Sequence, residues 1–197
     1  MNIVEITNAT NFSGGVQQVL ILCEGLAKKG HNIILVCDEN AKIKNFIKNP
    51  KIKIKHLKFK GSFDIASALK LHKIIRENSI DIVHAHHPYA HSVMFISSLI
   101  SKNAIFVATR RVIHPLPPNP LGKMKYKTRR LDKIIAVCNA VKERLVQDGI
   151  SPDRIEVIYS STDTEKFNPD KIEKGKILNE FGIKPDEKLV ALIGNYS

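Results

Sequence analysis

Short apolar segments rich in β-branched residues recur along the chain, and each is bounded by residues typical of turns. Two of them, residues 33–36 and 134–137, are continuously apolar. Such strands are buried on both faces, as in the parallel sheets of α/β proteins. Segments of this kind predict seven strands, at residues 2–7, 32–37, 52–57, 80–85, 105–109, 133–137 and 154–158.

Between several of these strands the apolar residues fall at helical spacing. Stripes of this kind predict helices within residues 16–27, 65–75 and 141–146. Gly30 and Gly149 follow the first and third stripes, where a left-handed residue ends many helices. The alternation of strand and helix predicts a doubly wound, Rossmann-like α/β fold with a mainly parallel sheet of about seven strands.

The pattern of apolar and polar residues changes after residue 158. Residues 160–170 are polar and turn-rich, residues 171–181 fit a short helix, and residues 188–194 resemble one more buried strand. We therefore expect a Rossmann-like domain over residues 1–168. Residues 169–197 are expected to be a linker and the opening strand of a missing second domain.

Charge narrows the range of partners. The 197 residues include 31 Lys and Arg against 19 Asp and Glu, a formal net charge of +12 at pH 7. Such an excess favours an anionic partner: nucleic acid, an anionic membrane surface or a phosphorylated substrate. We do not expect nucleic acid, because the chain has no Trp and only 6% aromatic residues for stacking on bases.

The compartment follows from the cysteines and the N-terminus. The three cysteines stand in no paired spacing and have apolar neighbours, which is typical of reduced, buried thiols. No signal-like segment opens the chain, and no apolar run approaches the roughly 18 residues that a membrane span needs. We therefore expect a cytoplasmic protein.

Loops after the predicted strands hold the candidate chemistry, because ligands of open parallel sheets bind beyond the carboxyl ends of the strands. After the first strand, residues 8–15 contain Asn11, Gly14 and Gly15 and lead directly into the first helix. Adjacent glycines and the free amides of a helix N-terminus favour a phosphate or other anion. The segment lacks both the GxGxxG and the GK[ST] pattern, and an ordinary strand-to-helix turn explains it equally well.

The fourth predicted strand ends in a segment rich in histidine. His84 and His86 share one face of the strand, and His87 follows. A metal site is disfavoured because no carboxylate follows closely in the sequence. We expect instead a neutral histidine that donates to a sugar hydroxyl or a phosphate, with His84 as the buried, structural residue.

Basic residues follow the fifth predicted strand in two groups. Arg110 and Arg111 offer fork-shaped donors for a phosphate or carboxylate, although an exposed pair on a surface loop is the equal alternative. A basic run over residues 123–130 fits an anionic membrane surface, but a solvated helix face explains it better. This run consists of Lys123, Lys125, Lys127, Arg129 and Arg130 with Met124 and Tyr126 among them.

Five segments, in order, carry a resemblance to a known family. They are Ser-Gly-Gly at 13–15, the helix end Leu-Ala-Lys-Lys-Gly-His at 26–31, the strand at 81–86, the segment at 131–137, and the strand at 154–158 with Asp163 and Phe167 downstream. Together, over residues 3–169, they resemble the N-terminal half of a retaining GT-B glycosyltransferase of the group-one, or family four, kind.

The resemblance implies two Rossmann-like domains facing across a cleft, of which this chain is one half. The C-terminal domain would hold most of the nucleotide-sugar, and the N-terminal domain the acceptor. Gly14 and Gly15 match the glycines that lie against the donor diphosphate, and His86 matches the catalytic histidine that reaches the transferring sugar. The residues assigned to the acceptor are Asn11, His87, Arg110 and Arg111. The resemblance implies no essential metal or other cofactor.

Three positions depart from the family pattern. Arg111 stands where a Thr-x-His motif has its histidine, Ser161 stands where a glycine is common, and Cys138 replaces a usual serine. Arg111 favours a charged acceptor, and Ser161 puts the hinge geometry in question.

The expected function is that of a hexosyl- or related glycosyltransferase of polysaccharide or lipopolysaccharide biosynthesis. It would move a sugar from a nucleotide diphosphate-sugar to a glycan or glycolipid with retention, through positioning and charge stabilisation. The enzyme would be cytoplasmic and peripheral on the inner face of the membrane. We expect this chain alone to be inactive. The alternative is a non-enzymatic, basic α/β module that binds an anionic partner.

Overall fold

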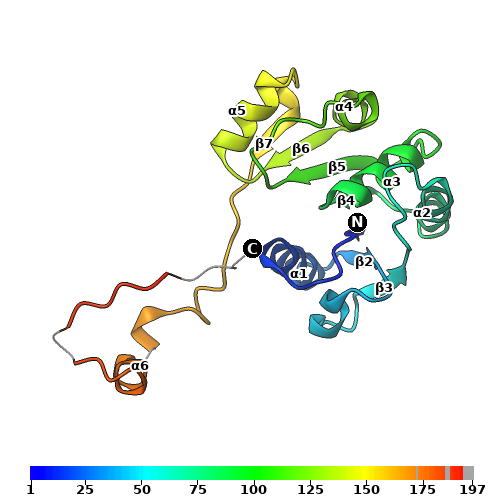
Figure 1. Cartoon of the computed structure of the whole chain (residues 1–197). Coiled ribbons are helices and arrows are strands. Elements are labelled where there is room, and N and C mark those ends of the chain that lie inside the picture. Colours follow the sequence, from blue (N-terminus) through cyan, green and yellow to red (C-terminus); the bar gives the residue numbers. More distant parts are fainter. Residues whose placement is uncertain (172, 185–186, 193–197) are drawn as a thin grey trace. The chain divides into compact units, whose positions relative to one another are not determined.

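The computed structural model describes residues 1–171, 173–184 and 187–192. The chain divides into two compact units, Met1–Ser160 and Ser161–Ser197. The first unit contains a parallel sheet of seven strands in the order β3-β2-β1-β4-β5-β6-β7 (Figure 1). The α/β fold predicted from the sequence is confirmed.

Each strand agrees with its predicted segment to within two residues at either end. The strands are β1 (Asn2–Ile6), β2 (Asn32–Cys37), β3 (Lys53–His56), β4 (Ile82–Ala85), β5 (Ile105–Arg110), β6 (Lys133–Ala136) and β7 (Ile155–Val157). The register places Ile6, Ala85, Ala108 and Ile134 side by side in one row. Successive side chains point to opposite faces, so this row belongs to one apolar face and its neighbours to the other.

Helices cover the two faces of the sheet unequally. They are α1 (Gly14–Lys28), α2 (Ile65–Glu77), α3 (Pro88–Ser98), α4 (Pro120–Lys127) and α5 (Asn139–Gln147), with short 3-10 helices η1 (Lys42–Phe46) and η2 (Pro152–Arg154). α1 and η1 share a core with β1 and β2 on one face. Residues of α2, α3, α4 and α5 share the core of the opposite face. Right-handed crossovers require this division. From β1 the sheet is extended first through β2 to β3 on one side, and then from β4 to β7 on the other side, so the connecting helices lie on opposite faces.

The stripes of the sequence predict α1, α2 and α5 but not α3. α3 is buried nearly all round, and an element without a polar face shows no stripe. α4 carries the first part of the basic run, and Arg129 and Arg130 follow its end at Lys127. Two neighbouring side chains of the helix, Lys125 and Tyr126, are buried. The solvated helix face expected there is therefore only partly formed.

The second unit contains η3 (Pro169–Lys171) and α6 (Lys174–Glu180), the latter within the short helix expected at 171–181. Residues 188–192 form no strand, and Val190 and Leu192 are 94% and 99% exposed. The described part of this unit offers no second strand for pairing, which is why the expected strand does not form here. Residues 193 and 194 of that expectation lie outside the described residues, and the boundary expected after residue 168 stays a prediction.

Two further sequence expectations concern the thiols and the membrane. Cys23 and Cys37 are buried, Cys138 is half-buried, and all three are free. None of the described helices is long and apolar enough to cross a bilayer.

Candidate functional site

The carboxyl edge of the sheet brings together residues from the loops after β1, β4 and β5. Ser13 caps α1 by accepting a hydrogen bond from the Val16 amide, which places Gly15 in the first turn of the helix. A Cβ on Gly15 would lie 3.5 Å from both Arg111 Cδ and His87 Nε2. The structure therefore places three of the predicted site residues side by side.

The other predicted residues of the first loop lie in the open. A Cβ on Gly14 would meet nothing within 4 Å, and Asn11 is exposed in the loop ahead of α1. Neither residue is held against the rest of the site by a contact that fixes it. Their predicted roles toward donor and acceptor stay predictions.

His87 is held by Thr7, the residue that follows β1. The Thr7 Oγ1 atom lies 2.7 Å from His87 Nδ1 and also accepts a hydrogen bond from the Ala9 amide at 3.2 Å. When Thr7 donates this hydrogen bond to Nδ1, the ring proton lies on His87 Nε2, the nitrogen that faces Gly15.

Charge at this edge is positive. Burial and the nearby Arg111 guanidinium both lower the pKa of His87, so its imidazole is neutral at pH 7. Burial lowers the pKa of Arg111, but a guanidinium remains charged in proteins. Within the described part of the chain, Arg111 Nε is buried without a hydrogen-bond partner. A neutral N–H donor and a cation thus meet the free amides of α1, an arrangement that suits an oxyanion.

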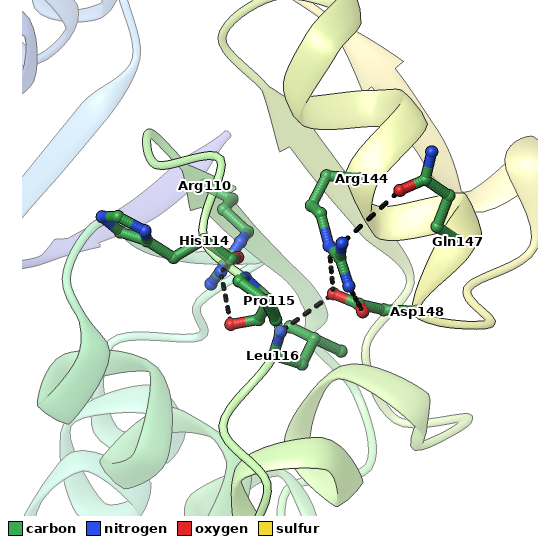
Figure 2. A network of polar contacts seen from close by, with 7 residues as sticks. All are labelled: Arg110, His114, Pro115, Leu116, Arg144, Gln147 and Asp148. Atoms are coloured by element: carbon green, nitrogen blue, oxygen red, sulfur yellow. Dashed lines mark hydrogen bonds and ion pairs between the residues drawn. The ribbon is translucent and has the colours of Figure 1, made fainter.

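Arg110 lies on the opposite face of the sheet from Thr109, because it is the last residue of β5 and side chains alternate. Its guanidinium is buried and donates to the backbone oxygens of His114 and Pro115 and, at 3.1 Å, to Tyr126 Oη (Figure 2 shows the backbone contacts). The two predicted arginines are therefore separated. Arg111 joins the glycine and histidine, and Arg110 holds the loop that carries Arg111.

The same loop is also fixed from α5. Asp148 accepts a hydrogen bond from the Leu116 amide at 2.8 Å and pairs with Arg144 at 2.5 Å, while Arg144 reaches Gln147 (Figure 2). The hydrogen bond from Arg144 lowers the pKa of Asp148, and the Leu116 amide acts in the same direction. Residues 110–116 are thus anchored at both ends.

A buried polar cluster lies beneath the edge, on the face of the sheet that α1 covers in part. Glu5 of β1 is paired in register with His84 of β4. Its Oε2 atom lies 2.6 Å from His86 Nε2 and 3.1 Å from His84 Nδ1, and His84 Nε2 lies 2.7 Å from Thr109 Oγ1. The side chains of Glu5 and His86 are each 1% exposed. His84 is buried as expected, and His86 is buried more deeply still.

Burial and hydrogen bonding set the ionisation of this cluster. Although burial alone would raise it, the interactions with His84 and His86 lower the pKa of Glu5 to about 2. Burial lowers the pKa of His86 to about 4. The cluster therefore contains an ionised carboxylate that accepts a hydrogen bond from the neutral imidazole of His86. Among the described residues, His86 Nδ1 is buried without a hydrogen-bond partner. The catalytic role of His86 stays a prediction.

The cluster also has the donor atoms of a metal site. Those of Glu5, His84 and His86 all lie within 4.8 Å of one another. The carboxylate that seemed missing from the sequence comes from β1, far upstream, so that objection to a metal is wrong. However, Oε2 already lies within hydrogen-bond distance of both imidazoles, and an ion would have to displace these contacts.

Sequence reasoning missed Glu5, Thr7 and Asn8. Asn8 Oδ1 accepts from the Tyr89 and Ala90 amides and so caps α3. The available signal was a charged residue within the apolar strand of residues 3–6, because a lone acid in a buried strand needs partners.

The comparisons with known proteins agree with this architecture. The family model described as Glycosyltransferase Family 4 matches residues 12–166. No curated protein matches the chain by sequence.

Solved structures share the fold at low sequence identity. A glycosyltransferase from Rickettsia africae is 22% identical with a TM-score of 0.79, and the match covers 94% of this chain and 50% of that one. Anabaena HepE, solved in complex with UDP-glucose, is 16% identical with a TM-score of 0.70, over 92% and 50% of the two chains. The lipopolysaccharide outer core galactosyltransferase WaaB is 14% identical with a TM-score of 0.62, over 83% and 46%. The chain thus spans about half the length of these relatives.

Proposed function

This chain belongs to glycosyltransferase family 4, and from that premise we propose that it forms the acceptor-side half of a retaining sugar transferase. The donor is a nucleotide diphosphate-sugar, gripped mainly by a second domain, and the acceptor is a glycan or glycolipid. HepE was solved with UDP and with UDP-glucose, which supports a nucleotide-sugar as the donor. Within this half, the proposal rests on residues at the carboxyl edge of the sheet.

The observation that carries the proposal is the convergence of Gly15, His87 and Arg111. Gly15 leaves the start of α1 without a side chain, so an oxyanion can approach the helix amides closely. Arg111 supplies a positive charge there, and His87 Nε2–H supplies a neutral donor. These three groups would bind the donor diphosphate and stabilise the charge that develops on it as the sugar departs.

The same geometry supports different tasks for the two neighbouring histidines. His87 faces Gly15 and can donate to the donor directly. His86 is enclosed with Glu5, so contact with the sugar requires its unpartnered Nδ1 to become accessible. We assign donor contact to His87 and positioning of the β1–β4 edge to His86. Glu5 is held by two imidazoles and cannot serve as a nucleophile, which leaves positioning and charge stabilisation to lower the barrier.

The test uses the enzyme with both halves present and a panel of nucleotide-sugars with glycan and glycolipid acceptors. We expect transfer from one donor with retention, read from the anomeric configuration of the product by NMR. The isolated 197-residue chain should show no transfer, because half a cleft cannot orient donor and acceptor. Transfer by the isolated chain, or an inverted product, would contradict the proposal.

We also propose that the enzyme associates with anionic membrane surfaces through the outer side of α4 and the segment that directly follows it. Lys123, Lys127 and Arg129 are exposed, whereas Lys125 and Arg130 turn inward. Basic residues near an anionic surface contribute on the order of 1 kcal/mol each. Co-sedimentation should be stronger with anionic than with zwitterionic vesicles and should weaken with salt, and equal binding to both would refute the association.

A further inference from the structure

A cavity of about 240 Å³ opens at the same edge of the sheet as the candidate site. Its lining comes from the loop after β3, from α3, from the loop between β5 and α4, and from α4. Pro88 and Tyr89, the two residues after His87, form part of its wall. The cavity has room for roughly eight water-sized groups. It therefore adjoins the proposed reaction site and is large enough for part of a substrate.

The walls of the cavity are mainly apolar. The apolar lining side chains are Phe63, Pro88, Tyr89, Phe95, Ile96 and Pro117. Phe63 and Tyr89 are 64% and 46% exposed, so this surface continues to the outside. On the far wall, a Cβ on Gly122 would meet Pro117 Cβ at 2.5 Å, and Asn119 Oδ1 accepts from the Gly122 amide. This tightly closed turn gives the cavity a fixed shape.

One cation belongs to this wall. Lys125 is 7% exposed, and its ammonium donates to Pro88 O at 2.8 Å and to Ser92 Oγ at 3.1 Å, both on residues that line the cavity. An ammonium has three hydrogens, so one N–H remains. Among the described residues, no carboxylate forms an ion pair with Lys125.

The surroundings make this cation unusual. Burial and, to a smaller extent, the charge of Arg110 lower the pKa of Lys125 to about 8. A buried ammonium without a counter-ion is costly, and an oxyanion beside it is attracted strongly because the apolar walls exclude water. The cavity thus combines an apolar lining with one positive charge that no carboxylate among the described residues neutralises.

We propose that this cavity binds an acceptor that carries an oxyanion, such as a phosphate, on an apolar group. The oxyanion accepts the remaining N–H of Lys125, and the apolar part lies on Phe63, Tyr89 and Ile96. The inference deepens the proposed function by naming an acceptor class. It rests on that function only in treating the bound molecule as the acceptor of the transferred sugar. Binding itself is measured without any transfer reaction.

The test titrates the chain with octyl phosphate below its micelle concentration, by calorimetry and by NMR of the backbone amides. We expect saturable binding, with shifts concentrated at residues that line the cavity. Octanol, inorganic phosphate and octyltrimethylammonium should each bind at least about tenfold more weakly, because each lacks the charge, the chain or the correct sign. Equal binding of octanol or of the ammonium would overturn the proposal.

Variants localise the binding. Lys125→Met should weaken octyl phosphate by about tenfold or more, whereas Lys70→Met, which alters an exposed lysine of α2 outside the cavity, should leave it unchanged. Phe63→Ala alters an exposed side chain, so it should fold normally and weaken octyl phosphate but not inorganic phosphate. If Lys125→Met fails to fold, Phe63→Ala decides. Unchanged affinity in Phe63→Ala, or equal losses in the two lysine variants, would show that the cavity is not the site.

Discussion

Glu5 Oε2 and His86 Nε2 lie 2.6 Å apart in the core, although the two residues are separated by 81 positions in the chain. Their contact is made possible by the register of β1 on β4, which sets Glu5 opposite His84. Both side chains are withdrawn from water, so their ionisation is coupled to folding. The pair ties the stability of the sheet to pH.

Acid should destabilise the chain in two stages. The folded-state pKa values of His86 and Glu5, about 4 and about 2, lie below their ordinary values of 6.5 and 4.5. The unfolded chain therefore binds more protons, and stability is lost as the pH falls from 6.5 towards 4 and again from 4.5 towards 2. We expect the free energy of unfolding, measured with urea, to fall by roughly 2–3 kcal/mol between pH 7 and pH 4.

A matched control separates the buried histidine from the others. His114→Gln alters an exposed histidine and should leave the acid profile unchanged. His86→Gln should flatten the stage between pH 6.5 and pH 4. If the profile of the original chain is flat, or the two variants behave alike, the coupling does not reside at His86.

Replacing the two neighbouring histidines should have opposite consequences in the enzyme with both halves. His87→Ala removes the donor that faces Gly15, and we expect kcat to fall by about 100-fold with little change in Tm. His86→Ala leaves Glu5 buried with one partner fewer and should cost about 3 kcal/mol of folding free energy. The measurement pairs turnover with thermal unfolding. Normal turnover in His87→Ala, with lost turnover and intact folding in His86→Ala, would restore His86 as the catalytic residue.

The seven strands could be predicted because buried parallel strands consist of continuous apolar residues, such as residues 33–36 and 134–137, which can be recognised locally in the sequence. α3 could not, because its buried surface extends round the helix and leaves no period to detect. The contact of Glu5 with His86 depends on strand order and register, which are properties of the assembled sheet. Sequence reasoning therefore found the histidines and missed their acid.

The arginine pair shows how one residue at a strand end changes a site. The strand predicted over 105–109 leaves Arg110 and Arg111 together in a loop, whereas β5 extends to Arg110. Alternation then sends Arg110 to Tyr126 and leaves Arg111 beside Gly15. Strand ends are set by the hydrogen bonds of neighbouring strands, which local composition does not report.

Replacing Arg110 and Arg111 one at a time by Met should affect stability and donor binding differently. Arg110→Met leaves the carbonyls of His114 and Pro115 without their donor, and we expect a loss of about 2 kcal/mol in the free energy of unfolding. Arg111→Met removes a guanidinium whose Nε has no partner, so stability should hold while the donor KM rises. Urea unfolding and donor kinetics measure both. A stable Arg110→Met together with an unfolded Arg111→Met would reverse the assignment.

The glycines of α1 allow the donor site to be tested without disturbing the fold. In Gly15→Ala the new Cβ lies at 3.5 Å from Arg111 and His87, an ordinary contact, so the chain should fold normally. The methyl group nevertheless occupies the space through which an oxyanion approaches the helix amides, and we expect the donor KM to rise by about tenfold or more. Gly25→Ala, in the same helix with nothing within 4 Å of its Cβ, serves as the control. It should gain up to about 1 kcal/mol of stability and keep its kinetics. Equal kinetics in the two variants would show that Gly15 does not face the donor. Both variants add one methyl group to α1, and they differ only in the surroundings of that group.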